Sequence, residues 1–372
     1  MTKLRYLSKK LPRVWIPRQK VLNNAELWPY EYELCKRFPL YFMLRWVYTK
    51  DEVAEQTRKL MPNYAHIHRI VDKFREEKLF AGVKSRRMQF TWVAMAYAIW
   101  MAVFFDDKRI MIQSLGEREV EFIFKDRLFF IIENLPPFFF REQPMRKGKE
   151  MLSMEIRFPW GSVIRGVPDS EQGTQLVGFT VSLWICDEAA IQKYLEKSIM
   201  GAKAAISGGG QAILFSSIRP TFYADVVEDV SDDILEVQQG DREIYEPMKG
   251  MQEWKNPCNG YFVMRLHYSA DPAKDPDTPE GLAWKIEERK GYATQRQWNQ
   301  EMEIDAAAMA ESLVYPQFNL QVHYKPDMDI KAHWTRYMRL DPGMDAPTAI
   351  LWAAVNELNE VYVYDEYYQR GG

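Results

Sequence analysis

The sequence predicts an α/β protein in which a mainly parallel sheet is flanked by helices, and three observations support this prediction. Short apolar runs of strand character alternate with longer helical patterns between residues 79 and 215, an order typical of parallel sheets. Polar residues follow the ends of these runs, where such sheets bind their ligands. The clearest run, residues 181–186, ends in two adjacent carboxylates, Asp187 and Glu188.

Composition limits the classes of protein that need consideration. The chain has 372 residues, of which 47% are hydrophobic and 27% charged, as in a globular protein of two or three domains. Its net charge of −3 means that a polyanionic partner must be met by local basic patches. The first 20 residues contain seven lysines and arginines, which suit either an arm that contacts phosphates or a solvated tail.

Cysteine content and apolar runs indicate the compartment. The three cysteines are widely spaced, which favours a reducing environment and argues against disulfides or a zinc site. The N-terminus lacks the apolar core of a signal peptide, so we expect a protein that is not secreted. The longest apolar run, residues 92–105, would be about 21 Å long as a helix, short of the roughly 30 Å core of a bilayer. It is predicted to be a buried helix, with no membrane contact.

The first elements in chain order lead to a candidate binding loop. Residues 1–60 are predicted to be an N-terminal helical segment, with helical sequence over 31–48 that is punctuated by Pro29 and Pro39. Residues 79–83 are predicted to form a strand, followed by a polar turn and the buried helix. Strand, polar turn and helix is the layout of a phosphate-binding loop, in which backbone N–H groups face an anion.

The alternation continues toward the two carboxylates and beyond them. Strands are predicted over residues 109–113, 152–158, 162–165 and 211–215, and a helix over 116–134. The strand over 211–215 is followed by Ser216 and Ser217. An aspartate and a glutamate at a buried strand end are typical of a Walker B motif, in which the first holds Mg²⁺ and the second polarises water. The sequence thus predicts a P-loop-type ATPase domain over residues 61–250.

The remaining chain is predicted to contain a connecting region and part of another domain. Residues 251–333 are assigned to the connecting or hinge region, with a helix over 280–303 and a linker after it. Residues 334–372 are predicted to form three strands joined by short turns, the first ending at Asp341. This pattern resembles the opening meander of an RNase H-like fold.

In this order the motifs resemble the large terminase subunit of tailed bacteriophages, the motor that pumps DNA into capsids and cuts it with an attached nuclease. The resemblance spans roughly residue 60 to the end. Residues 85–91 stand at the Walker A position, Asp187-Glu188 at Walker B, Ser216-Ser217 at the coupling motif, residues 298–301 and 314–318 at the hinge, and residues 340–343 at the first nuclease motif.

The resemblance implies an ATP site that uses Mg²⁺. Asp187 and Thr91 would bind the Mg²⁺, and Glu188 would activate the attacking water. Tyr64 would stack on adenine, while Ser216 and Ser217 would sense the γ-phosphate. The ATP-binding loop would comprise Lys84, Ser85, Arg86, Arg87, Met88, Gln89, Phe90, Thr91 and Trp92.

The loop departs from the family pattern at two positions. Gln89 stands where the family has glycine, and Phe90 where it has lysine. In one interpretation Lys84, Arg86 or Arg87 supplies the missing charge. In the other, the ATP site has decayed and the chain is a DNA-binding or scaffold module.

The resemblance also implies a nuclease metal and several partners. Asp341 would be the first ligand of Mg²⁺ or Mn²⁺ in the nuclease, whose last ligand would lie beyond Gly372, so we expect a truncated domain that cannot cut. The implied partners are double-stranded DNA, the portal protein, the small terminase subunit and further copies in a ring, all in the cytoplasm of an infected bacterial host. Arg165, Arg219 and the loop around Arg146 are candidates for a trans-acting arginine or for DNA contacts.

Overall fold

The computed structural model describes residues 16–50, 57–141, 143, 145–171, 180–228, 243–305, 328–341 and 347–370. Two compact units divide the chain, Met1–Ser312 and Leu313–Gly372. Three features of the sequence interpretation lie outside the described residues: the basic N-terminus up to residue 15, the hinge motif over 314–318, and Pro342 with Gly343.

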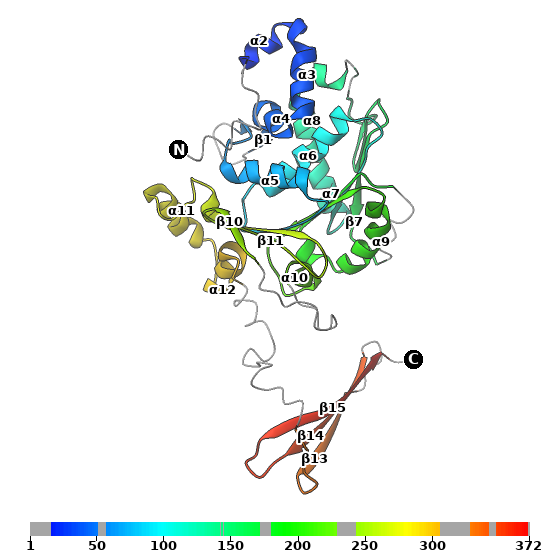
Figure 1. Ribbon diagram of the computed structural model, residues 1–372, viewed down its shortest axis with the longest axis vertical. Helices are drawn as coiled ribbons and strands as arrows, with labels where there is room; N and C mark the ends of the chain where they lie inside the picture. The colour runs from blue at the N-terminus through cyan, green and yellow to red at the C-terminus, as the bar shows by residue number, and fades with distance from the viewer. Residues whose placement is uncertain are drawn as a thin grey trace. The chain divides into compact units, whose positions relative to one another are not determined.

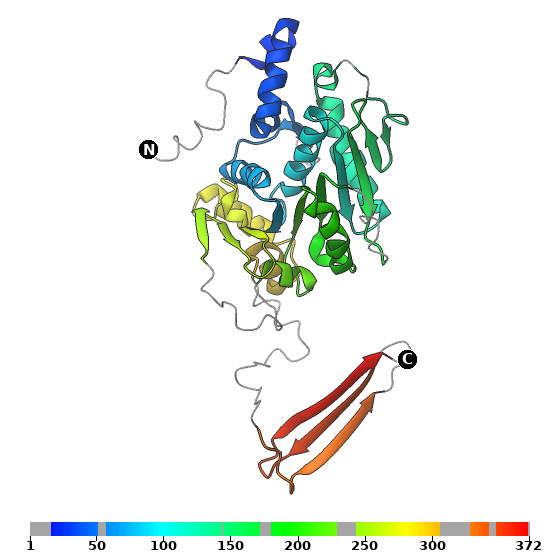
Figure 2. The ribbon, with the colours of Figure 1, turned by 45° about the vertical axis from the view of Figure 1, so that its right-hand side comes forward.

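The first unit is built on a ten-stranded sheet with helices on its faces (Figures 1 and 2). Its six central strands are parallel and lie in the order β12-β3-β9-β8-β4-β7. These strands are β3 (Leu79–Lys84), β4 (Arg109–Ser114), β7 (Val163–Pro168), β8 (Leu183–Asp187), β9 (Gln211–Ser216) and β12 (Phe262–Leu266). The predicted α/β class with a mainly parallel sheet is confirmed.

Short antiparallel strands extend the sheet at both edges. β10 (Tyr245–Met248) and β11 (Met251–Lys255) continue it beyond β12, and β6 (Glu155–Arg157) and β5 (Met151–Leu152) continue it beyond β7. Residues 251–266 were expected in the connecting region, whereas the structure places them in the sheet. β12 joins the sheet by pairing with β3, which is far away in the sequence, with Phe262 opposite Phe80. A pairing between such distant segments cannot be predicted from local sequence patterns.

Alternate residues of the four innermost strands, β3, β9, β8 and β4, face two separate cores. In β3, Phe80 joins a core on one face, whereas Ala81 and Val83 join the core on the other. The first core contains helix α6 (Phe90–Phe104), and the second is covered by α9 (Leu195–Ser207) and α10 (Phe222–Val227). This two-sided burial explains why the strands are apolar along their whole length rather than alternating.

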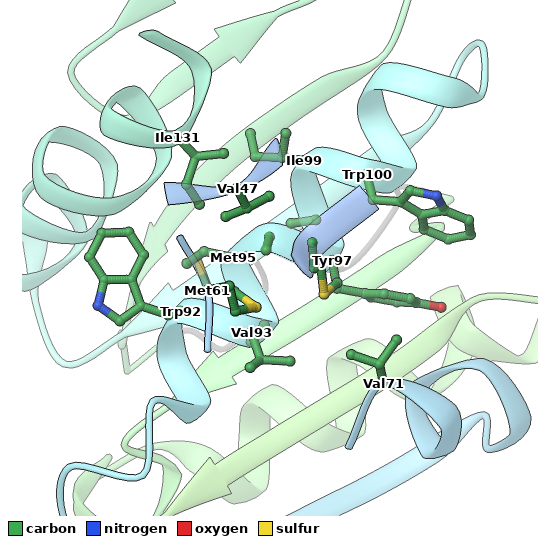
Figure 3. Packing of buried hydrophobic residues seen from close by; sticks show 14 of the residues in the cluster. Val47, Met61, Val71, Trp92, Val93, Met95, Tyr97, Ile99, Trp100 and Ile131 are labelled. Carbon is green, nitrogen blue, oxygen red and sulfur yellow. The ribbon is translucent and has the colours of Figure 1, made fainter. Parts of the chain in front are cut away.

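Helix α6 is apolar on all sides and is the centre of the larger core. Thirteen of its 15 residues are buried, as expected for a helix surrounded by protein. Figure 3 shows Val47, Met61, Val71 and Ile131, from four other segments, packed around it. The buried helix predicted over 92–105 is therefore present, and it begins two residues earlier.

The N-terminal helices pack into the same core as α6. They are α2 (Arg18–Leu22), α3 (Trp28–Arg37) and α4 (Pro39–Trp46), followed by the short strands β1 (Tyr48–Lys50) and β2 (Arg58–Leu60). The helical sequence over 31–48, which Pro39 was expected to punctuate, is divided at Phe38, which is extended with φ −126° and ψ 90°. Pro39 causes this break, because proline disfavours the helical conformation of the residue before it.

The remaining described helices connect and cover the strands. They are α5 (Ala65–Glu76), α7 (Glu117–Ile123), α8 (Phe129–Asn134), α11 (Pro279–Arg289), α12 (Gln295–Trp298) and the π-helical turn η7 (Asn299–Glu303). The helix expected over 280–303 is divided after Lys290. Thr294 caps the new helix α12, because its hydroxyl accepts a hydrogen bond of 3.1 Å from Gln297 N. None of the described helices is both long enough and apolar enough to cross a bilayer.

The second unit contains an antiparallel meander of three strands (Figure 1). They are β13 (Thr335–Asp341), β14 (Pro347–Val355) and β15 (Val361–Arg370). In the register, Asp341 at the end of β13 lies opposite Ala349. The three strands predicted for this part of the sequence are confirmed.

Candidate nucleotide site

Three strand ends place the predicted site residues at one edge of the sheet. β3 ends at Lys84, β8 at Asp187 and β9 at Ser216. β9 lies between β3 and β8, and all three strands are parallel. The residues that follow them therefore share the carboxyl edge, where open α/β sheets bind ligands.

The loop between β3 and α6 has the backbone of an anion-binding turn. Arg87 and Gln89 both adopt left-handed conformations, with φ of 60° and 57°. Glycine usually occupies such positions because a Cβ makes them unfavourable. No side chain caps the first turn of α6, so its N–H groups are available to a phosphate. The loop thus keeps left-handed turns although Gln89 replaces the glycine.

Five side chains meet next to this loop. Thr91 Oγ1 donates a hydrogen bond to Asp187 Oδ2 over 3.4 Å. Lys84 Nζ lies 3.4 Å from Glu188 Oε1, and Ser216 Oγ donates to Glu188 Oε2 over 3.1 Å. Glu188 is itself left-handed, with φ 52°, so a strained backbone turns its carboxylate toward Lys84 and Ser216.

Asp187 has the properties of a carboxylate that holds a cation. Burial and the neighbouring Glu188 raise the pKa of Asp187 to about 7, opposed by Lys84. A divalent cation bound by Asp187 would offset both effects. Mg²⁺ prefers oxygen ligands such as this carboxylate and the hydroxyl of Thr91, so the residues present fit the ion that the sequence implies.

The site opens into a cleft of about 840 Å³. Tyr64 lines this cleft, as expected for a residue that contacts the base. Its charged lining residues are five cations and one acid: Lys50, Lys59, Lys84, Arg87, Arg127 and Asp187. Several of these cations are paired with carboxylates beside the cleft, Lys50 and Arg127 with Asp126 and Arg87 with Glu288, so a bound polyphosphate would compete with these carboxylates for the cations.

Phe90, at the position of the family's lysine, belongs to the hydrophobic core. It is 1% exposed, and its ring lies 4.7 Å from that of Phe215. Gly82 on β3 makes room for it, because a Cβ on residue 82 would lie 2.8 Å from Phe90 Cζ. Phe90 borders the cleft but cannot supply positive charge to it.

The three basic candidates for the missing charge have different surroundings. Lys84 is 7% exposed and lies beside Glu188. Arg87 lines the cleft, but its side chain is largely exposed and lies 2.8 Å from Glu288. Arg86 Nε donates a hydrogen bond of 2.7 Å to Glu301 Oε2. Of the three, Lys84 is the one held next to Asp187 and Glu188.

The other predicted loop and coupling residues are placed as follows. Ser85 is buried and donates to Met302 O over 2.5 Å, away from the cleft. Met88 and Trp92 line the cleft, and Arg127 lies 4.5 Å from the centre of the Trp92 ring. Ser217 is buried after β9, so only Ser216 of the serine pair has a hydrogen bond to Glu188 among those described.

The remaining arginine candidates lie in ion pairs. Arg165 pairs with Glu155, and Arg146 with Glu150. Arg219 pairs with Glu301. Exposed pairs such as the first two stabilise little, so they leave Arg165 and Arg146 accessible to a partner.

Asp341 is exposed at the end of β13. Within the described ranges, no three His, Cys, Asp or Glu side chains are grouped closely enough to hold a metal ion.

The sequence interpretation missed four residues of the site. Lys50, Lys59 and Arg127 reach the cleft from β1, β2 and the π-helical segment η2 (Phe124–Leu128), which joins α7 to α8. Glu301 contacts the phosphate loop from η7. No local pattern marks them, because only the fold brings these distant segments together.

Comparison with solved structures identifies the fold. Neither a scan of protein-family models nor a search of curated proteins found a match. The large terminase of bacteriophage HK97 is similar with a TM-score of 0.50 and 13% identity, over 89% of this chain and 67% of that one. The large terminase ATPase domain of Thermus phage P74-26 has a TM-score of 0.43 and 16% identity, over 66% and 94% of the two chains. The large terminase of a thermophilic bacteriophage, in complex with ATP-γ-S, has a TM-score of 0.40 and 12% identity, over 82% and 68%. The HK97 likeness shows that this chain has the fold of a bacteriophage large terminase.

Proposed function

We propose that this chain is an ATPase that drives double-stranded DNA into a viral procapsid. The observation that carries the proposal is the meeting of Lys84, Thr91, Asp187, Glu188 and Ser216 at one strand edge. These are the residue types that phosphoryl transfer to water requires: a cation, metal ligands and a carboxylate that positions the water. The terminase fold supports the coupling of this reaction to DNA packaging.

Each residue has a distinct role in the proposed reaction. Thr91 and Asp187 would hold Mg²⁺, which when bound neutralises charge on the phosphate oxygens. Lys84 supplies the positive charge that Phe90 cannot, from the end of β3 rather than from the start of α6. Glu188 orients the attacking water and accepts its proton, held by Lys84 at 3.4 Å and Ser216 at 3.1 Å. Because Ser216 donates a hydrogen bond to Glu188, it would be affected when the γ-phosphate next to Glu188 leaves.

The rest of the cleft suits the remainder of the nucleotide. Tyr64 would stack on adenine, and Arg87, Met88, Gln89 and Trp92 line the space beside the phosphates. In the same proposal, several copies of the chain form a ring that binds the portal protein and the small terminase subunit. Asp341 would be the first metal ligand of its nuclease, binding Mg²⁺ or Mn²⁺.

One observation favours the alternative, a P-loop fold that no longer hydrolyses ATP and serves as a DNA-binding or scaffold module. Phe90 is built into the core, so the position that normally supplies the lysine has been given a structural role. The two proposals differ in whether Lys84 can replace that lysine. ATP binding measured with and without Mg²⁺ separates them, because the alternative predicts no binding at millimolar nucleotide.

The direct test compares Glu188→Gln with Glu196→Gln. Glu196 is exposed on α9, so the same chemical change there should leave hydrolysis as it is. Glu188→Gln should bind ATP and lose at least about 100-fold in turnover, because the residue that activates the water is gone. Turnover of Glu188→Gln equal to that of the wild-type protein would reject this role.

A further inference from the structure

The π-helical turn η7 lies against the start of the phosphate loop. Arg86 N donates a hydrogen bond to Glu301 O over 3.1 Å, and Ser85 Oγ donates to Met302 O over 2.5 Å. Short π-helical turns occur frequently at functional positions. The loop is thus held on the side away from the cleft, by a segment that is distant in the sequence.

A buried carboxylate lies at the centre of this contact. Glu301 is 7% exposed. Its Oε2 accepts a hydrogen bond of 2.7 Å from Arg86 Nε, and its Oε1 accepts one from Arg219 Nη2. Arg86 follows β3 and Arg219 follows β9, which are neighbouring strands. The Glu301 side chain therefore connects the loop after β3 to the loop after β9.

The strands that lead into these two loops end in the groups that hold Glu188, because Lys84 is the last residue of β3 and Ser216 the last residue of β9. Lys84 precedes Arg86 by two residues, and Ser216 precedes Arg219 by three. Lys84 and Ser216 contact opposite oxygens of the Glu188 carboxylate. A shift of these loops would act on the paired ends of β3 and β9, and so displace the two groups that contact the Glu188 carboxylate.

The charges make this connection depend on Glu301. Two guanidinium groups share one carboxylate, and Arg219 Nε is buried without a hydrogen-bond partner among the described groups. Without the negative charge, the two guanidinium groups would lose their shared acceptor and repel each other, with part of the repulsion screened by water because the Arg86 side chain is 58% exposed. We expect the loops to move apart in that case.

We propose that Glu301 is a positioning residue for ATP hydrolysis, which sets the spacing of Lys84 and Ser216 around Glu188 by pairing with both Arg86 and Arg219. This inference rests on the proposed ATPase function. Among the described hydrogen bonds, the Glu301 carboxylate has its contacts with Arg86 and Arg219 and none with Lys84, Glu188 or Ser216, so it acts through its partners. Its loss should therefore slow turnover more than it weakens ATP binding.

The first test is steady-state hydrolysis by Glu301→Gln, which keeps the size and one acceptor oxygen but removes the charge. We expect kcat to fall at least about tenfold and KM to change less than about threefold, because small displacements of reacting groups chiefly affect the chemical step. Glu301→Asp keeps the charge and should retain more of the wild-type kcat. A folded Glu301→Gln protein with kcat within about twofold of wild type overturns the inference.

A double variant separates positioning from general stability. Arg219→Gln should also lower kcat, and Glu301→Gln with Arg219→Gln should be no slower than Glu301→Gln alone, because both changes break one contact. Additive losses contradict the inference. Should Glu301→Gln fail to fold, Arg219→Gln, which leaves the Arg86 pair intact, decides on its own. Glu287→Gln is the control, since Glu287 is exposed and pairs with the exposed Lys290.

A second measurement does not depend on hydrolysis and so distinguishes the two proposals. Hydrogen exchange of peptides covering residues 84–92 and 216–222 should be faster in Glu301→Gln than in wild type. Faster exchange together with an inactive wild-type protein would reject the ATPase proposal but keep the connection between the loops. Unchanged exchange in both peptides would reject the role of Glu301 even if the wild-type protein hydrolyses ATP.

Discussion

Phe90 occupies the position of a charged residue and has been fitted into the core instead. Replacing it with lysine is expected to destabilise the protein and not to increase hydrolysis. Phe90 is 1% exposed and packs on Phe215 and Phe80, so an ammonium group there would be buried without a partner. Thermal unfolding should show Tm lower by about 5 °C or more.

Phe90→Leu is the control for this substitution, because it changes the volume of the side chain but adds no charge. Phe90→Leu should lower Tm less than Phe90→Lys does. A Phe90→Lys protein with the wild-type Tm and faster ATP hydrolysis would show that the residue can reach the phosphates, and the role given to Lys84 would then fall.

Asp187 predicts a pH dependence of stability. Its pKa is raised from 3.8 to about 7 in the folded protein by burial and by Glu188. Between these values the folded state holds a proton that the unfolded state has released, so stability falls as pH rises through this window and is constant above it. At pH 8 the ionised Asp187 carboxylate therefore lowers the stability of the folded protein. Below the pKa of Asp187 in the unfolded chain, the side chain is protonated in both states and this effect is absent.

Asp187→Asn tests this dependence, since the amide has the same size and no charge. In metal-free buffer at pH 8 its Tm should exceed that of wild type by at least about 3 °C, and the difference should shrink toward pH 4.5. Mg²⁺ with ATP-γ-S should raise the Tm of wild type but not that of the variant. A difference in Tm independent of pH would contradict the raised pKa.

At the scale of elements, the close contact between β3 and α6 depends on Gly82. A Cβ there would lie 2.8 Å from Phe90 Cζ and 3.2 Å from Phe215 Cβ. Gly82→Ala should therefore cost about 1–3 kcal/mol, a typical value for overpacking, measured by urea denaturation. Gly291→Ala is the control, because its nearest atom would be 3.4 Å away. Restoration of stability in Gly82→Ala by Phe90→Leu would confirm the cause, and equal stability of the two alanine variants would refute it.

The elements that could be predicted are those whose signal is local. The strand ending at Lys84, the buried helix after it and the strand ending at Asp187 each have a continuous apolar run bounded by polar residues. Parallel strands then place their carboxyl ends together, so Thr91 beside Asp187 follows from the pattern.

The elements that could not be predicted depend on distant segments. β12 pairs with β3, and Glu301 reaches Arg86, although each pair is far apart in sequence. Lys50 and Lys59 reach the cleft from a short hairpin with no motif. Their chemistry is visible in the sequence, but their location is set by tertiary packing.

At the scale of the whole molecule, the site draws on almost the entire first unit. Lys50 and Lys59 lie near its beginning, Asp187 and Ser216 in its middle, and Glu301 near its end. These residues reach the site from the faces and edges of one sheet, so a stable site requires that the unit folds as a whole. Its second core, which includes Ile304, closes only shortly before the unit ends at Ser312.

A chain of residues 1–312 is therefore expected to fold and to hydrolyse ATP without the meander of β13, β14 and β15. Domains with their own core can generally fold alone, and every residue proposed here for ATP hydrolysis belongs to this unit. The Tm of its main transition and its kcat without DNA should match those of the full chain within about 2 °C and twofold.

A chain of residues 1–297 is the control. It lacks Trp298 and all of η7, including the hydrogen bonds of Glu301 to Arg86 and of Met302 to Ser85, so it should unfold at lower temperature and hydrolyse ATP more slowly. If the 1–312 chain were inactive while the full chain was active, the second unit would have to contribute to the ATP site, and the division of labour proposed here would be wrong.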